Sequence, residues 1–320
     1  MSKVLHAYQN DPQNYISQAK IPYDILADLV NESLGGLNGK VILDLGVGFQ
    51  LIHGGLSLAL ALRDGAKQCF GIDIAHPDLH SADPAKIAFW KRASEELDID
   101  VQGLDEGRLV FASTDILHFD DFFSKITLLQ MSASEMWFKD NMFDIVISNA
   151  VFEHIQSPQA VVSELFRVLK PGGGAAISWN PFTGLRMGGH DIGMPYHYPW
   201  AHLRLNKKDH IAELCKVFSS KDLYNSAFPV EHTPTDERAS VYKEDPELFR
   251  HQISYDLNKM RISELLEYAN KAGFEVIQSH AHVFDEDRPA LTQEILSELE
   301  GYTEDELLQT FHTLVVKKPL

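Results

Sequence analysis

The chain has 320 residues, 44% of them hydrophobic, which is enough apolar material for one large α/β domain or for one domain with a sizeable insertion. Its 46 acidic side chains outnumber the 28 Lys and Arg and give a formal net charge of −18, which argues against DNA or RNA as a partner because phosphate binding needs clustered basic side chains. The sequence contains no run of about 18 apolar residues, so it predicts no membrane span. The two cysteines, Cys69 and Cys215, are too few for a disulfide framework or a cysteine-rich zinc site.

The first part of the chain predicts strands that alternate with helices. Residues 1–10 lack the apolar core of a secretory signal, so we expect a cytoplasmic protein. The elements expected in chain order are a helical segment over 1–40, strands over 41–45, 68–74, 126–131, 143–149 and 175–179, helices over 51–63, 85–97 and 157–169, and a turn over 170–174. Ser157 and Pro158 mark the N-cap and first residue of the last helix. This alternation predicts a parallel, doubly wound sheet with an insertion over 98–124.

Residues 180–250 interrupt the alternation and are rich in Pro, Gly, His and aromatic residues, so we interpret them as an inserted lid. The elements expected after the lid are a helix over 261–273 with a glycine stop, a strand over 274–279, a helical stretch over about 291–308 and a last strand over 310–317. We therefore divide the chain into an N-terminal helical segment (1–40), a cofactor-binding core (41–180), a lid and acceptor region (181–250) and a C-terminal completion of the sheet (251–320).

The strand over 41–45 ends in a glycine turn that favours a nucleoside-bearing cofactor. Gly46 and Gly48 let the backbone turn sharply and approach a ligand, Asp44 lies at the end of the strand, and Asp73 at the end of the next strand is placed to bind the two hydroxyls of a ribose. A dinucleotide site expects a third glycine where this chain has Leu51, which argues against NAD. The competing interpretation is that the glycines only make a turn between strand and helix.

Four sequence blocks carry a resemblance to a known family. They are residues 41–50, residues 71–74, residues 131–154 and residues 165–173, with a looser fifth block over 272–276. Through these blocks the chain resembles the class I S-adenosylmethionine-dependent methyltransferases, particularly their type 11 branch. The resemblance implies a Rossmann-like, mostly parallel seven-stranded sheet with an antiparallel C-terminal strand, and S-adenosyl-L-methionine as the cofactor.

The resemblance also implies which residues bind the cofactor. Asp44, Gly46 and Gly48 would surround its methionine part, and Asp73 with Ile74 would hold the ribose. The remaining positions are Ser132 and Ala133 along the adenine, and Asn149, which with Ala150 would form the floor of the pocket. Two positions depart from the family pattern: Gln50 replaces a frequent third glycine, and Ser132 replaces a usual Asp.

Glu153 and His154 are the candidate catalytic residues. In the resembled family a His at this position can lie near the acceptor, and some members use the acidic pair around it for a metal. If the acceptor is a hydroxyl, a His with a pKa near neutrality suits a general base. The competing interpretation is that Glu153 and His154 only order the loop before the helix that starts at Ser157.

The lid contains a dense group of polar and aromatic side chains. We expect His190, His197, Trp200 and His202 to contact the acceptor, since pockets for small molecules combine aromatic surfaces with a few polar groups. A divalent metal bound by His190, Asp191, His197 and His202 is a less favoured reading, because this spacing matches no standard zinc pattern, and we predict no metal. A packed aromatic lid whose His side chains bind backbone atoms is the third alternative.

The sequence therefore favours a cytoplasmic S-adenosylmethionine-dependent methyltransferase that acts on a small-molecule or glycan-like acceptor at oxygen, without a nucleic-acid or membrane partner. The alternatives are a nicotinamide-dependent oxidoreductase and a non-catalytic member of the fold that binds a cofactor or a partner protein.

Overall fold

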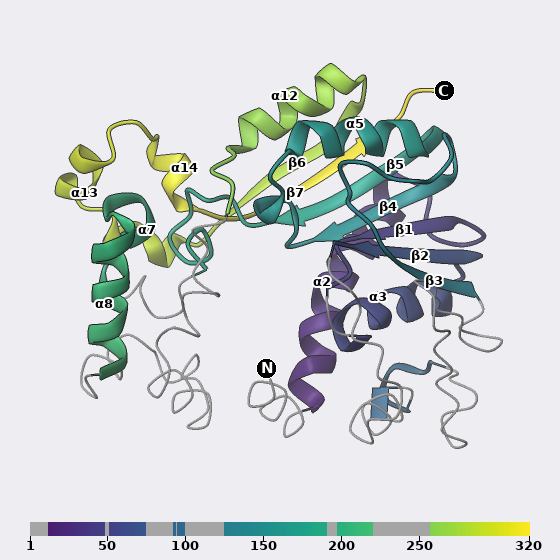
Figure 1. Ribbon diagram of the computed structural model, residues 1–320, viewed down its shortest axis with the longest axis horizontal. Helices are drawn as coiled ribbons and strands as arrows, with labels where there is room; N and C mark the ends of the chain where they lie inside the picture. Colours follow the sequence, from purple (N-terminus) through teal and green to yellow (C-terminus); the bar gives the residue numbers. More distant parts are fainter. Residues whose placement is uncertain are drawn as a thin grey trace.

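The computed structural model describes residues 12–48, 51–74, 92–93, 95–99, 125–190, 197–219 and 257–320. Seven strands form one sheet in the order β3-β2-β1-β4-β5-β7-β6 (Figure 1). Their bounds are β1 Val41–Leu45, β2 Gln68–Asp73, β3 Ile126–Gln130, β4 Phe143–Asn149, β5 Leu169–Trp179, β6 Glu275–Val283 and β7 Gln309–Lys317. The alternation of strands and helices in the sequence thus produces the expected doubly wound sheet.

The direction of the strands agrees with the prediction of a mostly parallel sheet. The pairs β1–β2, β2–β3, β1–β4 and β4–β5 are parallel, whereas β7 is antiparallel to both β5 and β6. The central strand β1 is followed in the chain by β2 on one side and paired with β4 on the other, so the strand order reverses at β1. In open α/β sheets, ligands bind in the crevice outside the carboxyl ends of the strands at such a reversal.

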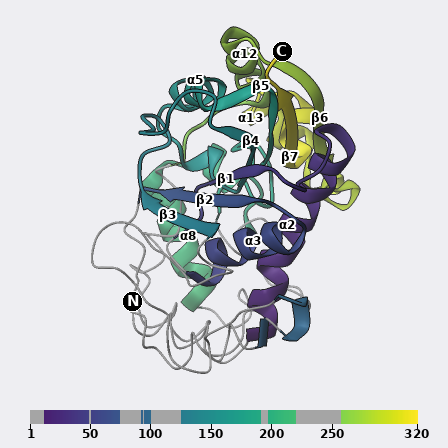
Figure 2. The same cartoon turned by 90° about the vertical axis from the view of Figure 1, so that its right-hand side faces the viewer.

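Helices cover both faces of the sheet (Figures 1 and 2). One face carries α2, Pro12–Ser33, and α3, Leu51–Arg63, and the other carries α5, Pro158–Val168, and α12, Ile262–Ala272. Side chains alternate along β1, so that Ile42 packs with α2 and α3 while Leu43 and Leu45 pack with α5 and α12. Each such fully buried aliphatic side chain contributes about 1.5–3 kcal/mol.

A smaller group of helices lies beyond the end of the sheet and includes residues 201–219 of the predicted lid (Figure 1). It consists of α7, Ala201–Arg204, α8, Lys207–Ser219, η5, Asp285–Ala290, α13, Gln293–Glu298, and α14, Glu304–Leu308. Its core is apolar and centres on Trp200, which is fully buried and donates its Nε1–H to the carbonyl of Leu307 at 3.1 Å. Residues 197–219 are therefore anchored to the C-terminal part of the chain.

Three sequence-based expectations differ from the structure. The predicted turn over 170–174 lies within β5, where the register jumps from Phe143↔Leu169 to Ile145↔Gly174, so the extra residues form a bulge instead of ending the strand. The helical stretch over 291–308 is divided into α13 and α14, because Thr303 caps α14 through a hydrogen bond with Glu306 N. Ser157 occupies the N-cap of α5 but makes no side-chain capping bond there.

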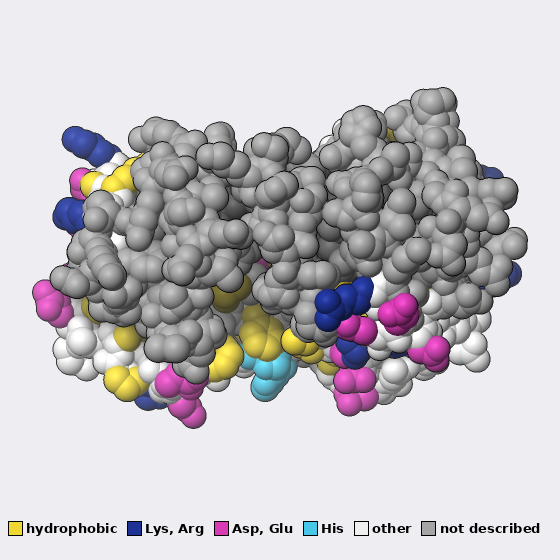
Figure 3. Space-filling view, turned by 90° about the horizontal axis from the view of Figure 1, so that it is seen from below, with side chains coloured by type: hydrophobic (Ala, Val, Ile, Leu, Met, Phe, Trp, Pro, Cys, Tyr) yellow, Lys and Arg dark blue, Asp and Glu magenta, His cyan; other side chains and the backbone are white. Residues whose placement is uncertain are grey.

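Most of the helix expected over 85–97 lies outside the described residues, as does the insertion over 98–124 apart from residues 98 and 99. No helix in the described ranges is long and apolar enough to cross a membrane. On the face seen in Figure 3, acidic and basic side chains of described residues lie intermixed beside a group of hydrophobic and His side chains.

Candidate active site

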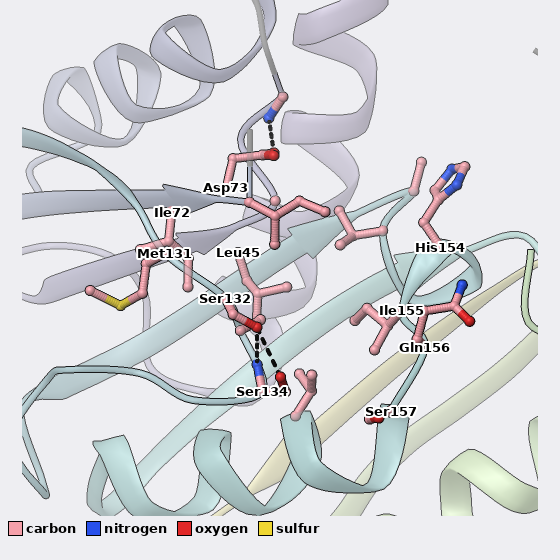
Figure 4. A pocket seen from close by; sticks show the side chains of 17 residues that line it. Leu45, Ile72, Asp73, Met131, Ser132, Ser134, His154, Ile155, Gln156 and Ser157 are labelled. Atoms are coloured by element: carbon pink, nitrogen blue, oxygen red, sulfur yellow. Dashed lines mark hydrogen bonds between the residues drawn. The ribbon is translucent and has the colours of Figure 1, made fainter. Parts of the chain in front are cut away.

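A cavity of about 560 Å³ lies at the carboxyl ends of β1, β2, β3 and β4. This volume suits a small-molecule ligand, since such pockets measure roughly 300–1,000 Å³. Its lining is mainly apolar, and its polar side chains come from separate parts of the fold, among them Asp73 at the end of β2, Ser132 after β3 and His154 after β4 (Figure 4). The cavity therefore occupies the crevice that the strand order predicts.

The two glycines after β1 have left-handed backbones, with φ of 80° at Gly46 and 79° at Gly48. They differ in their surroundings. A Cβ on Gly46 would lie 2.3 Å from Val151 Cγ2, whereas among the described residues nothing lies within 4 Å of a Cβ on Gly48. Gly46 therefore permits the close packing of two loops, and Gly48 leaves open space where the turn borders the cavity.

Asp73 joins the glycine turn to the end of β2. Its Oδ2 accepts a hydrogen bond from the backbone N–H of Gly48 at 2.9 Å (Figure 4). The next side chain, Ile74, is 74% exposed although it is a large hydrophobic residue, and it also lines the cavity. The Ile74 backbone is fixed from β3, because Gln130 Nε2 donates to its carbonyl at 3.1 Å. A carboxylate and an exposed apolar surface thus stand side by side at the cavity.

Asp44 lies beneath the glycine turn and is not among the described residues that line the cavity. Strand alternation directs its side chain toward α3, where Ser57 Oγ donates a hydrogen bond to Asp44 Oδ2. Burial raises the pKa of Asp44 to about 7, the hydrogen bond from Ser57 opposes this rise, and the nearby charge of Asp73 adds to it. The Asp44 carboxyl therefore changes its charge near neutral pH.

The loop after β3 forms another side of the cavity. Ser132 and Ala133 both line it, and the Ser132 hydroxyl lies 2.8 Å from that of Ser134 (Figure 4). After β4, Ala150 lines the cavity with a left-handed backbone, φ 52°, whereas the preceding residue Asn149 is not among the described lining residues. A left-handed Ala is strained, and such strain often accompanies functional sites.

Glu153 and His154 lie on the short 3-10 helix η3, Phe152–His154, but in different environments. Glu153 is fully buried, and its Oε1 accepts a hydrogen bond from Asn180 Nδ2 at 2.9 Å. His154 lines the cavity, and partial burial lowers the pKa of its imidazole, an effect that Glu153 opposes.

Sequence reasoning missed Asn258, which holds this 3-10 helix in place. Its Nδ2 donates to the carbonyls of Phe152 at 2.6 Å and Ile155 at 2.7 Å, and its backbone N–H donates to the carbonyl of Glu153 at 2.8 Å. An isolated Asn more than a hundred residues away gives no local signal for such a contact, so only the folded structure identifies it.

The four residues predicted to contact the acceptor lie in different places. His190 Nε2 lies 3.7 Å from Glu153 Oε1, and the His190 ring centroid is 5.1 Å from that of His154. His197 pairs with Glu213 at 3.2 Å, and His202 Nε2 lies 2.9 Å from the carbonyl oxygen of Phe182. Trp200 is buried in the apolar core of the smaller group of helices beyond the end of the sheet. Of the four, the structure brings His190 to the predicted catalytic pair, while Asp191 lies outside the described residues.

Comparison with known proteins agrees with the position of this site. The family model for a methyltransferase domain matches residues 43–177, a segment that contains every described residue lining the cavity. An uncharacterized methyltransferase from Mycobacteroides abscessus is 34% identical over 74 residues, which cover 23% of this chain and 28% of that protein. One from Mycobacterium avium is 34% identical over 71 residues, covering 22% and 28%. The matched part of the chain thus spans little more than a quarter of the length of these relatives.

Two solved structures are similar in outline. One is the [4+2]-cyclase SpnF, with a TM-score of 0.44, 17% identity, and coverage of 93% of this chain and 81% of the other. The other is a putative sarcosine dimethylglycine methyltransferase from Galdieria sulphuraria, with a TM-score of 0.45, 15% identity, and coverage of 93% and 85%.

Proposed function

We propose that the cavity binds S-adenosyl-L-methionine and that the protein methylates a small-molecule or glycan-like acceptor at oxygen. The chain belongs through residues 43–177 to the class I S-adenosylmethionine-dependent methyltransferases, and the proposal starts from this family. The cofactor supplies an electrophilic methyl group on a positively charged sulfur. The chain's own residues bind and orient the reactants, and positioning of this kind can contribute about 7–11 kcal/mol to catalysis.

The observation that most favours the cofactor is the pairing of Asp73 with the turn at Gly48. The N–H of Gly48 fixes one oxygen of the Asp73 carboxylate, which stands at the cavity wall beside the exposed side chain of Ile74. A carboxylate suits the two hydroxyls of a ribose, and an apolar surface next to it suits an adenine ring. The open space at Gly48 is where a ligand could approach the backbone without meeting a Cβ.

We assign cofactor binding to the residues that the family pattern suggested: Asp44, Gly46, Gly48, Asp73, Ile74, Ser132, Ala133 and Asn149. Asp44 would act from beneath the turn, because it is buried against Ser57. Ser132 and Ala133 would lie along the adenine from the β3 side of the cavity.

We assign the acceptor end of the cavity to His154 and Glu153. His154 faces the cavity, partial burial lowers the pKa of its imidazole, and the neutral form of this imidazole can accept the proton of an acceptor hydroxyl. Glu153 lies behind it, in contact with Asn180. Of the four residues of the predicted lid, His190 is the one supported as an acceptor contact by its position near this pair.

Titration calorimetry tests the cofactor assignment. We expect S-adenosylhomocysteine to bind and NAD not to bind, and we expect Asp73→Ala to weaken S-adenosylhomocysteine by at least tenfold. Binding of NAD instead would favour an oxidoreductase, and binding of neither would favour a non-catalytic member of the fold.

His154→Ala tests the catalytic assignment. We expect this variant to bind S-adenosylhomocysteine like the unmodified protein and to transfer label from S-adenosylmethionine to a fractionated cell extract at least a hundredfold more slowly. Unchanged turnover would remove His154 from the mechanism.

A further inference from the structure

Three potential metal ligands meet beside the cavity. The ligand atoms of Glu153, His154 and His190 all lie within 4.8 Å of one another. Glu153 and His154 come from the loop after β4, whereas His190 comes from the segment after β5, so the fold brings them together from two places. His154 lines the cavity, which connects the cluster to the ligand space.

Two buried polar atoms in this cluster have no hydrogen-bond partner among the described residues: Glu153 Oε2 and His190 Nε2. Glu153 is fully buried, and Asn180 satisfies its other oxygen, Oε1. His190 does not complete the pair, because its Nε2 lies 3.7 Å from Glu153 Oε1, too far for a hydrogen bond. A buried carboxylate without a compensating charge is strongly unfavourable, so the site favours a cation.

The backbone at His190 adopts an uncommon left-handed conformation, and the imidazole of this residue lies near Glu153. His190 has a φ of 53°, in the left-handed region, which residues other than glycine occupy uncommonly and in which His, like Asn and Asp, is enriched. Its N–H donates to the carbonyl of Met187 at 3.2 Å, which closes the turn. Strain of this kind persists where surrounding structure imposes it and often accompanies a binding site.

We propose that Glu153, His154 and His190 together bind one divalent transition-metal ion of the Zn²⁺ class. Two imidazoles and one carboxylate form a ligand set that suits such ions and leaves a coordination position open. Ligand atoms that share one ion at about 2.0–2.2 Å lie about 3–4 Å from one another. Side-chain rotations that move the three ligand atoms by about 1 Å would therefore bring them to this spacing.

This inference deepens the proposed function, on which its catalytic role rests. A hydroxyl of the acceptor would take the open position, where the ion lowers its pKa. The proton leaves to solvent, the oxygen forms a bond to the methyl carbon, and the bond from that carbon to sulfur breaks to release S-adenosylhomocysteine. His154 then acts as a ligand of the ion, and the ion takes over its role in activating the hydroxyl.

Metal binding is tested without reference to turnover. The full-length protein is stripped with EDTA and titrated with ZnCl₂ by calorimetry, and with CoCl₂ by visible absorption, which reports the coordination of Co²⁺. We expect one ion per chain, and we expect Glu153→Gln and His190→Asn each to weaken binding by at least a hundredfold. Asn tolerates the left-handed backbone at position 190, so this variant keeps the turn while it removes the imidazole.

His280→Gln is the matched control. His280 and His282 form a second pair of imidazoles on β6, with ring centroids 4.3 Å apart, that could attract the ion instead. We expect this variant to bind Zn²⁺ like the unmodified protein. Absence of binding, binding that survives both Glu153→Gln and His190→Asn, or binding that is lost in His280→Gln would overturn the proposal.

Titration of the stripped protein with S-adenosylhomocysteine separates the two proposals. Normal binding of this compound without any Zn²⁺ binding would reject the metal and leave the cofactor assignment in place. Normal Zn²⁺ binding without any binding of S-adenosylhomocysteine would reject the cofactor assignment and leave the metal site without its catalytic role.

Discussion

Replacement of Gly46 or Gly48 by Ala should have very different effects on stability, although both residues have the same backbone conformation. The φ values are 80° and 79°, so a Cβ introduces a similar backbone strain of about 1–2 kcal/mol at each position. At Gly48 a Cβ meets nothing within 4 Å among the described residues, but at Gly46 it would lie 2.3 Å and 2.6 Å from the two methyl carbons of Val151. Such overpacking adds about 1–3 kcal/mol.

We therefore expect Gly48→Ala to lower the free energy of unfolding by about 1 kcal/mol and Gly46→Ala to lower it by about 2–4 kcal/mol. Urea denaturation followed by tryptophan fluorescence measures both. Because all three heavy atoms nearest to a Cβ on Gly46 belong to Val151, Val151→Ala should relieve the effect of Gly46→Ala in a double-mutant cycle. Equal losses at the two glycines, or no relief by Val151→Ala, would refute this reasoning.

The same pair of variants separates stability from ligand binding. Gly48 borders the cavity, so a methyl group there would occupy ligand space even though it disturbs the protein little. We expect Gly48→Ala to weaken S-adenosylhomocysteine by at least tenfold while it remains the more stable of the two. Unchanged affinity would show that the proposed ligand does not approach the turn at Gly48.

Two further predictions concern groups behind the cavity. Asn258→Ala removes the donors to the carbonyls of Phe152 and Ile155, so it should lower the free energy of unfolding by about 1–3 kcal/mol and reduce turnover more than cofactor affinity, as measured by denaturation, assay and calorimetry. Burial raises the pKa of Asp44 to about 7, so between about pH 4 and pH 7 the unfolded state loses this proton before the folded state does, and stability falls as the pH rises. Asp44→Asn should abolish that dependence. The free energy of unfolding of the variant minus that of the unmodified protein should therefore rise by on the order of 4 kcal/mol from pH 4 to pH 8. Urea titrations at both pH values would measure this difference, and a difference that stays constant would contradict the prediction.

The sequence predicted that the glycine turn and Asp73 lie together at the ends of two neighbouring strands because the signals for this arrangement are local. The glycine turn, the apolar strand before it and the carboxylate at the end of the next strand lie within about thirty residues, and period-two alternation fixes which side of the sheet each side chain faces. The bounds expected for α3 and β4 agree with the structure for the same reason. Asp44 shows the limit of this reasoning, since the pattern places it at the strand end but does not reveal that it is buried against Ser57.

The contacts around Glu153 were less predictable because they join distant segments. Neither the approach of His190 to Glu153 nor the hydrogen bonds of Asn258 have a periodic or compositional signature. The bulge in β5 was mistaken for a turn because Gly172, Gly173 and Gly174 favour both, and only the pairing with β4 and β7 decides between them. The division into four segments and the roles of all the predicted site residues stay predictions.

The place of β7 between β5 and β6 has a consequence for how the protein is made. The edge of β5 pairs with β7, and Trp179 Nε1 donates to His312 Nδ1 across a separation of 133 residues. On the ribosome, β1 to β5 can therefore assemble the nucleotide half of the cavity while the edge of β5 stays open until β7 is translated. We expect Asn180, which follows β5 directly and donates a hydrogen bond to Glu153, to gain its final position only when that edge is closed. The nascent chain should thus become able to bind a nucleoside before it can organise the acceptor end, and during that interval its open strand edge is a target for chaperones and for aggregation.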